Sequence, residues 1–212
     1  MDEKIKNVYD AVLAGEADAV KENIQISLDA GLDPNLILNE GMIGAMREVG
    51  QRFEAGDFFV PEMLISARAM QGGMALLKPH LQKGGVQSSG KVVIGTVKGD
   101  LHDIGKNLVA LMLEGAGFEI KDLGTDVAAE DFIAAIKSEK PDILALSALL
   151  TTTMPSMKQT IEAVKEAGLR DQVKVIIGGA PVTEDYSRQI GADGFSPDAS
   201  RAVGLAESLL KG

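Results

Sequence analysis

The chain has 212 residues, which is long enough for one large domain or for two modest domains with real cores. Its formal net charge is -10, from 21 basic and 31 acidic residues. This balance argues against a nucleic-acid-binding surface, because phosphate contacts need clustered Lys and Arg. The chain contains no cysteine, which excludes disulfides, thiolate catalysis and iron–sulfur ligation within it.

The sequence also lacks the usual signs of membrane insertion or export. No apolar run is long enough to cross a bilayer, and the first residues do not form the charged, apolar and small-residue pattern of a secretory signal. We therefore expect a cytoplasmic location without membrane association.

The first part of the chain, from about residue 2 to residue 81, is predicted to be helical, because apolar residues recur there at helical spacing between glycine breaks. Asp33-Pro34 is a favourable helix start, with Pro at the first helical position, and Pro61 opens another helix. Met74 to Leu77 is predicted to form a final short helix. We expect an all-α bundle of four or five helices over residues 1–85.

The stretch from Lys83 to Gly90 has the Gly- and Ser-rich composition of a linker. We place the domain boundary there, with residues 86–90 as the linker and residues 91–212 as the second domain. His80, beside a proline at the end of the last helix, is interpreted as a surface or helix-end histidine and not as a metal ligand.

Strands and helices alternate from Lys91 onward, which predicts parallel βαβ units. The expected strands are Val92–Val97, Glu119–Asp122, Ile143–Ser147, Val173–Ile177 and Gly194–Phe195. The expected helices are Ile104–Gly115, Ala129–Glu139, Pro155–Ala167, Val182–Ile190 and Ala199–Leu210. This pattern predicts an α/β, flavodoxin-like (Rossmann-like) doubly wound sheet of five parallel strands. No G-x-G-x-x-G follows the first strand, so a dinucleotide site is not expected.

The loop from Gly99 to Gly105 lies between the first expected strand and its helix, at the sheet edge where ligands bind in α/β proteins. A neutral imidazole such as His102 is a common transition-metal ligand, and Asp100 can accept a hydrogen bond from its other ring nitrogen. Gly99 and Gly105 would let a flat, bulky ligand approach the backbone. The alternative interpretation is a polar turn in which Asp103 caps the helix.

Three segments in this order resemble the signature of the B12-binding domains that hold cobalamin through a histidine on cobalt: Asp100-x-His102-x-x-Gly105, Ser147-x-Leu149 and Gly178-Gly179. The last two segments taken alone are common turn chemistry. Together with its helical first half, the chain is similar over its length to the corrinoid proteins of methyltransferase systems and to the cobalamin-binding module of methionine synthase.

The resemblance implies a cobalamin or related corrinoid cofactor, with His102 as the cobalt ligand. Thr153 stands where methionine synthase has a serine that hydrogen-bonds the ligand-supporting aspartate, which implies a relay of His102, Asp100 and Thr153. Alternatively, the threonine run is a loop ending at the helix that Pro155 begins. The residues of this domain implied to contact the cofactor are Gly99, Asp100, His102, Asp103, Ile104, Gly105, Ser147, Leu149, Thr151, Gly178 and Gly179.

The helical half contributes a second implied contact. The segment from Phe53 to Met63 resembles the cap that covers the upper face of the corrin in this family, with Phe53, Val60 and Met63 at the covering positions. The alternative is that these three side chains belong to the ordinary bundle core, because Met and Phe at helical spacing usually do.

The function implied by the resemblance is methyl transport. Co(I) would accept a methyl group from a substrate-specific corrinoid methyltransferase, and methyl-Co(III) would deliver it to a second methyltransferase with a tetrahydrofolate or thiol acceptor. A reductive activator protein is a further implied partner. The chain would act as a carrier subunit and not as a complete enzyme. The methyl donor stays open among methylamines, methanol, methyl ethers and betaines.

Three other interpretations fit parts of the sequence. The small subunit of an adenosylcobalamin-dependent mutase shares the three motifs but would not need the apolar cap. A B12-dependent regulatory or sensor protein is expected to have a DNA-binding head and Trp in its helical bundle, and this chain has neither a basic head nor any Trp. A cofactor-free signalling domain of the flavodoxin type is expected to have an acidic cluster after the first strand, which Asp100 and Asp103 match poorly.

Overall fold

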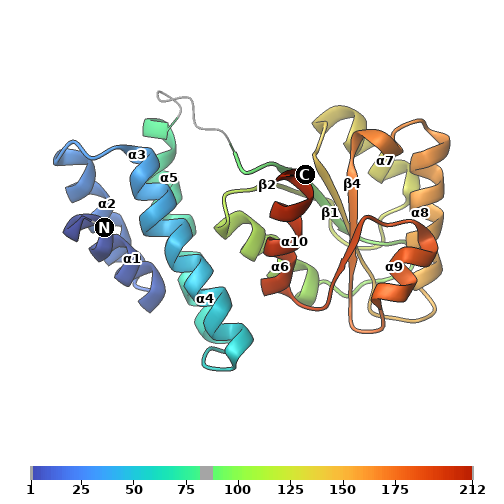
Figure 1. Cartoon of the computed structure of the whole chain (residues 1–212), viewed down its shortest axis with the longest axis horizontal. Helices are drawn as coiled ribbons and strands as arrows, with labels where there is room; N and C mark the ends of the chain where they lie inside the picture. Colours follow the sequence, from blue (N-terminus) through green and yellow to red (C-terminus); the bar gives the residue numbers. More distant parts are fainter. Residues whose placement is uncertain (1, 82–87, 212) are drawn as a thin grey trace. The chain divides into compact units, whose positions relative to one another are not determined.

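The computed structural model describes residues 2–81 and 88–211. The chain divides into two compact units, Met1–Gln87 and Ser88–Gly212 (Figure 1). Residues 83–87 of the expected linker lie outside the described residues. Ser89, within the expected linker, packs with the second unit, because its backbone N–H and its hydroxyl donate to the carbonyls of Gly117 and Ala116. No helix in the described ranges is long and apolar enough to cross a membrane.

The first unit is an all-α bundle, as predicted. Its elements are α1 (Glu3–Ala14), α2 (Ala17–Asp29), α3 (Pro34–Leu36), the π-helical segment η1 (Ile37–Ile43), α4 (Gly44–Ala55) and α5 (Val60–Leu81). The helix start expected at Asp33-Pro34 is confirmed, because the Asp33 carboxylate accepts a hydrogen bond from Asn35 N. The separate short helix expected at Met74 to Leu77 was wrong, because these residues continue α5.

Apolar stripes on these helices form the core of the bundle. The helices α2 and α5 approach so closely at Gly73 that a Cβ there would lie 2.7 Å from both Val20 and Ile24. The fully buried large side chains of this unit are Ile5, Ile24, Ile37, Met42, Met46, Met63 and Leu77.

The second unit contains one five-stranded parallel sheet in the order β2-β1-β3-β4-β5. The strands are β1 (Lys91–Thr96), β2 (Glu119–Asp122), β3 (Ile143–Ser147), β4 (Lys174–Gly178) and β5 (Gly194–Ser196). The helices are α6 (Ile104–Gly115), α7 (Ala129–Glu139), α8 (Met154–Glu166), α9 (Glu184–Ile190) and α10 (Ala199–Lys211), with a 3-10 turn, η2 (Arg170–Gln172), before β4. This order confirms the predicted flavodoxin-like, doubly wound fold.

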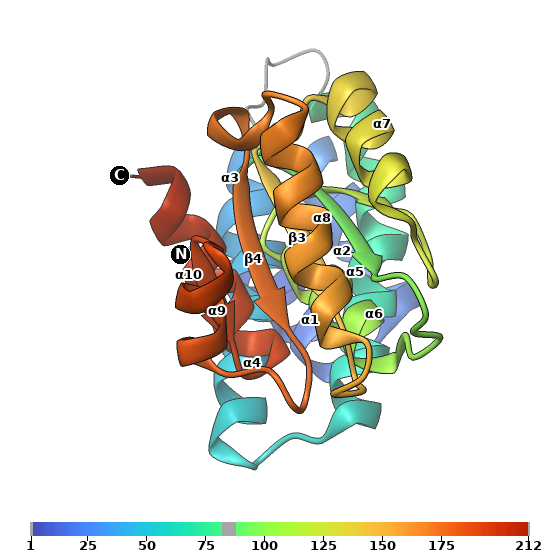
Figure 2. The same ribbon diagram turned by 90° about the vertical axis from the view of Figure 1, so that its right-hand side faces the viewer.

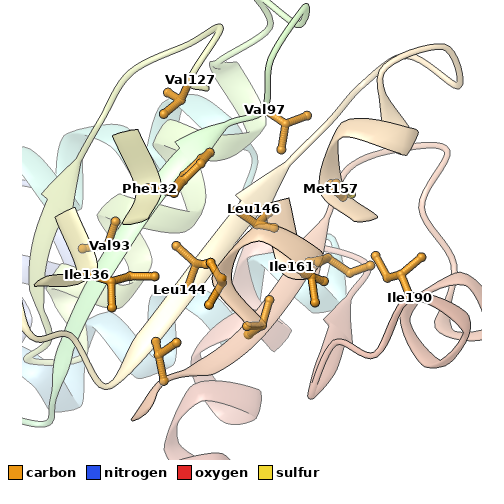
Figure 3. Close-up of a cluster of buried hydrophobic side chains, with 14 of the residues drawn as sticks. Val93, Val97, Val127, Phe132, Ile136, Leu144, Leu146, Met157, Ile161 and Ile190 are labelled. Carbon is orange, nitrogen blue, oxygen red and sulfur yellow. The ribbon is translucent and has the colours of Figure 1, made fainter. Parts of the chain in front are cut away.

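Helices cover both faces of the sheet, and in Figure 2 helix α8 lies in front of β3 and β4. Val93, Leu144 and Leu146 point toward the face covered by α7, α8 and α9, where they pack with Phe132 and Ile161 (Figure 3). The alternate strand positions pack with α6 and α10 on the other face; they include Val92, Ile94, Ile143, Ala145 and Ile176. Burial on both faces explains why the strands read as nearly continuous apolar runs.

The carboxyl ends of the strands carry small and hydroxyl residues instead of aliphatic ones. Thr96, Ser147, Gly178 and Ser196 are register partners across β1, β3, β4 and β5. The chain leaves β1 toward α6 on one face and β3 toward α8 on the other. The loops after these two neighbouring strands therefore flank the point where a doubly wound sheet binds its ligands.

Candidate functional site

The loop that follows β1 makes a tight turn before α6 begins. Gly99 has φ +86°, a left-handed conformation that favours glycine. The backbone N–H of Asp100 donates to Val97 O at 3.1 Å, and the buried hydroxyl of Thr96 donates to His102 O at 2.9 Å. These bonds bring Asp100 and His102 back over the end of β1.

The carboxylate of Asp100 is fully buried at the centre of this edge. Its Oδ1 lies 2.8 Å from Nδ1 of His102 and accepts a bond of 3.0 Å from His102 N. Its Oδ2 accepts from the hydroxyl of Thr153 at 2.6 Å, from Leu149 N at 2.8 Å and from Leu150 N at 3.2 Å. One carboxylate thus joins the loop after β1 to the loop after β3.

Two opposing effects act on the pKa of Asp100. Burial disfavours the charged form and raises the pKa, but the hydrogen bonds from Thr153, His102 and Leu149 stabilise the carboxylate more strongly. Their net effect is to hold the pKa of Asp100 well below its usual range. The group is therefore an anion near neutral pH and can act only as an acceptor.

An anionic Asp100 fixes the tautomer of His102. Since Oδ1 can only accept, Nδ1 of His102 must donate, which leaves the lone pair on Nε2 for another partner. The side chain of His102 is 50% exposed although its carboxylate partner is 0% exposed. This is the arrangement of a histidine oriented by a buried carboxylate and ready to bind a metal.

The two loops that meet at Asp100 carry four exposed apolar side chains. Leu101 and Ile104 are 72% and 76% exposed, and Leu149 and Leu150 are 41% and 42% exposed. We call these four residues the apolar collar. The sequence analysis singled out Ile104 and Leu149 but missed Leu101 and Leu150, whose signal was a large apolar residue inside a polar loop.

The remaining residues expected in this domain lie at the same edge. Ser147 and Gly178 are register partners at the ends of β3 and β4. Gly179 has φ +131°, and a Cβ there would lie only 1.9 Å from Ala148 O, so the position requires glycine. Thr151 is exposed beside the collar.

Asp103 and Gly105 open helix α6. Asp103 stands at the N-cap position of α6, but among the described residues its carboxylate accepts from the side-chain amide of Asn107 at 3.1 Å and makes no capping bond to the helix backbone, so the alternative capping interpretation does not hold for its side chain. Beyond its own turn of helix, a Cβ built on Gly105 would meet nothing in the described residues within 4 Å, which leaves open space at the start of α6.

Comparison with known proteins agrees with this geometry. Residues 90–204 match a family described as a B12 binding domain, and residues 5–78 match a second family of the same description. The chain is 44% identical over 211 residues to trimethylamine corrinoid protein 1 of Methanosarcina acetivorans, covering 99% of this chain and 98% of that protein. This chain belongs to the methyltransferase-associated corrinoid proteins.

Solved structures support the same assignment for this corrinoid protein. It matches a chain in the crystal structure of the methanol:cobalamin methyltransferase complex MtaBC from Methanosarcina barkeri with a TM-score of 0.89 and 34% identity, covering 100% of this chain and 81% of that one. A cobalamin-binding protein from Desulfitobacterium hafniense matches with a TM-score of 0.81 and 33% identity, covering 99% and 98% of the two chains.

The described residues fit a corrinoid, which this protein binds. A corrin is a broad macrocycle with a metal at its centre, and the edge offers one outward imidazole nitrogen inside an apolar collar. Open space at Gly105 would let the ring lie close to the backbone, and Gly178 and Gly179 at the end of β4 keep side chains away from the neighbouring strand ends.

The three expected cap residues lie in the first unit, and they differ in exposure. Val60 is exposed and Phe53 is half-buried, but Met63 is fully buried in the bundle core. The neighbouring side chains of Phe59 and Leu64 are exposed instead. The exposed large apolar residues at this end of the bundle therefore include Phe59, Val60 and Leu64, whereas Met63 is buried.

Proposed function

We propose that this corrinoid protein carries a methyl group from a donor-specific methyltransferase to a second methyltransferase. His102, oriented by Asp100, would hold the cobalt of a bound corrinoid, which would supply the nucleophile for methyl transfer. The observation that carries the proposal is the buried Asp100 carboxylate that orients a solvent-accessible His102, in a chain similar over its whole length to methylamine corrinoid proteins.

The proposed role of His102 follows from its two nitrogens. Asp100 holds Nδ1 of His102, so the ring is oriented and Nε2 would be available to hold the cobalt of a bound corrinoid. Thr153 would support this pair by holding the second oxygen of Asp100.

A methylated amine is the donor class that we propose first. The support is the identity of 42% to 44% with proteins named for trimethylamine and dimethylamine, against 34% with the chain in the methanol methyltransferase complex. The acceptor is proposed as a tetrahydrofolate or a thiol on a second methyltransferase. A reductive activator that restores oxidised cobalt is a further proposed partner.

The proposed cap role concerns Phe53, Val60 and Met63 of the first unit. An apolar surface over the reactive face of the cofactor would exclude water from a reduced metal. Phe59 and Leu64 extend the exposed apolar surface of the same segment. Met63 would act from below, by supporting the exposed neighbours.

The experiment begins with the apoprotein incubated with hydroxocobalamin and desalted. We expect wild type to retain the corrinoid and to show a histidine-ligated spectrum, and His102→Ala to lose that spectrum. His80→Ala, which removes the other histidine of the chain, is the matched control and should behave as wild type.

The second stage offers the reduced holoprotein trimethylamine, dimethylamine or methanol, each with a methyltransferase specific for that donor. Methylation of the cofactor from one donor, followed by its loss to a thiol or tetrahydrofolate with a second methyltransferase, would establish the carrier role. A holoprotein that is methylated by none of these enzymes would overturn it, even if the corrinoid is bound.

A further inference from the structure

The loop between β2 and α7 meets the histidine loop at one residue that the site described above does not include. This residue, Asp126, has φ +54°. Among the described residues, Asp126 and Lys140 are the two non-glycine residues with a positive φ. The left-handed conformation costs free energy for a residue with a Cβ, although Asp tolerates it better than most.

Asp126 makes two hydrogen bonds to the same dipeptide. Its carboxylate Oδ1 accepts from Gly99 N at 2.7 Å, and its own backbone N–H donates to Asp100 O at 2.9 Å. Asp126 thus binds both ends of the Gly99–Asp100 dipeptide, and the carboxylate of this Asp100 orients His102.

The loop that carries Asp126 is itself anchored to β1. Thr96 N donates to Gly124 O at 2.9 Å, and Val127 N donates to Thr96 O at 3.0 Å. Thr96 in turn donates its hydroxyl to the carbonyl of His102. The backbone on both sides of Asp126 is therefore held to β1 by hydrogen bonds.

Core packing does not explain the strained backbone, because Asp126 is exposed. Its polar groups could be satisfied by water in many other conformations. The two bonds of this exposed, strained residue both go to the dipeptide that contains Asp100, the aspartate that orients His102. The strain is therefore explained by the position that Asp126 imposes on this dipeptide.

We propose that Asp126 is a positioning residue for cobalt ligation, which fixes the Gly99–Asp100 backbone so that Nε2 of His102 points at the metal. The inference rests on the proposed ligation of cobalt by His102. Without the hydrogen bonds from Asp126, the Asp100–His102 pair keeps its own hydrogen bond, but the loop that carries the pair shifts. Because His102 then points less accurately at the metal, the fraction of cobalt bound by His102 falls.

The test separates the side-chain bond from the backbone conformation with three variants. Asp126→Asn keeps an acceptor oxygen and tolerates a positive φ, Asp126→Gly relieves the backbone but loses the acceptor, and Asp126→Ala loses the acceptor and keeps the strain. Lys140→Gly is the matched control, because Lys140 has φ +49° at the end of α7.

The readout is the paramagnetic resonance spectrum of the cobalamin-loaded, Co(II) form of each protein, produced with nitrogen-15-labelled histidine. The spin of the labelled nucleus differs from that of ordinary nitrogen, so the label changes the splitting only where a protein histidine is the axial ligand. The ratio of His102-ligated to unligated cobalt follows from the spectrum. Thermal unfolding of each apoprotein is measured in parallel.

We expect Asp126→Gly and Asp126→Ala to lower that ratio by about two- to tenfold, the range for one lost hydrogen bond. Asp126→Asn should restore it, and Lys140→Gly should leave it at the wild-type value. Asp126→Gly should unfold close to wild type, because relief of strain offsets the lost bond.

Each contrary outcome has a separate meaning. If wild type shows no label-dependent splitting, the ligation of cobalt by His102 fails, and the inference about Asp126 falls with it. If wild type shows the splitting and the folded Asp126→Gly and Asp126→Ala variants match it, His102 remains the ligand and the positioning role of Asp126 is overturned.

Discussion

The hydroxyl of Thr153 lies 2.6 Å from Oδ2 of Asp100, although the two residues are separated by 53 positions in the chain. The other oxygen of the same carboxylate lies 2.8 Å from the ring nitrogen of His102. The start of α8 is thereby connected to the histidine through a single buried anion. A substitution at Thr153 should therefore affect the position of His102 through Asp100, without a direct contact between Thr153 and His102.

Replacement of Thr153 by Val should remove this donor while keeping the shape of the side chain. We expect the free energy of unfolding of the apoprotein to fall by about 1–3 kcal/mol, because a buried carboxylate loses a partner. Thr153→Ser should recover most of the loss. The measurement is chemical denaturation followed by circular dichroism.

Thr160→Val provides the control for the Thr153 variants. Thr160 is also buried on α8, but its hydroxyl donates to the backbone carbonyl of Ser156 at 2.8 Å and does not contact Asp100. Thr160→Val should leave the pH dependence of stability unchanged, whereas Thr153→Val should weaken it, because the Thr153 hydroxyl helps to hold the pKa of Asp100 below its usual range. Equal effects of the two Val substitutions on that pH dependence would contradict a specific role of Thr153.

Asp100→Asn should change how stability depends on pH. Because the folded pKa of Asp100 is held below its unfolded value of about 3.9, its ionisation stabilises the folded state above that value. This contribution is lost as the pH falls through the folded pKa. The wild-type advantage over Asp100→Asn should therefore be full above about pH 5 and shrink below pH 4.

The measurement is the free energy of unfolding of both apoproteins between pH 3 and pH 7. The difference between them isolates Asp100 from the other carboxylates, which titrate equally in both. A difference that stays constant over this range would show that the carboxylate is not stabilised as the structure indicates.

Much of the second unit could be predicted from the sequence. The strand Ile143–Ser147 and the helix Ala129–Glu139 have the predicted bounds. The strand is a short apolar run, the helix has apolar residues at helical spacing, and turn residues separate the two. The Asp100–His102 pair could be predicted, because residues two positions apart in one loop lie close together. The bonds from Leu149 N and Leu150 N to Asp100 could not be predicted, since they depend on how two loops meet in space.

The first unit shows a different limit of sequence analysis. Met63 occupies a helical position that fits both a core residue and a cap residue, and periodicity cannot tell which neighbour the side chain meets. The structure buries it among the helices, where Met63 and Met70 share one face of α5. The role of Asp126 left no sequence signal beyond a turn residue, because its effect lies in a backbone conformation.

The glycines at the edge of the sheet should differ in their tolerance of a methyl group. Gly179→Ala should destabilise the apoprotein by at least about 3 kcal/mol, because the new Cβ would overlap Ala148 O and the backbone has a positive φ. Gly105→Ala should instead stabilise the apoprotein by about 0.5–1 kcal/mol, since Gly105 lies in a helix with open space around it.

Gly105→Ala should nevertheless weaken corrinoid retention, because the methyl group would occupy space beside His102. Equilibrium dialysis with hydroxocobalamin measures this effect separately from folding. A stabilised Gly105→Ala protein that binds the cofactor as tightly as wild type would show that the corrin does not approach the backbone there.

Substitutions at a buried and at an exposed position of the cap segment should have different effects. The first should change stability, and the second should change protection of the cofactor. Met63→Ala should lower the free energy of unfolding of the protein by roughly 2–5 kcal/mol, because it leaves a cavity in the bundle core. Val60→Ala truncates a side chain that is 36% exposed and should cost less than Met63→Ala, because Met63 is fully buried. If Val60 covers the corrin as proposed, Val60→Ala should still speed the oxidation of the reduced holoprotein in air-equilibrated buffer.

Leu36→Ala, at an exposed apolar position outside the segment, is the control for this oxidation measurement. Equal oxidation rates for wild type, Val60→Ala and Leu36→Ala would remove Val60 from the proposed cap.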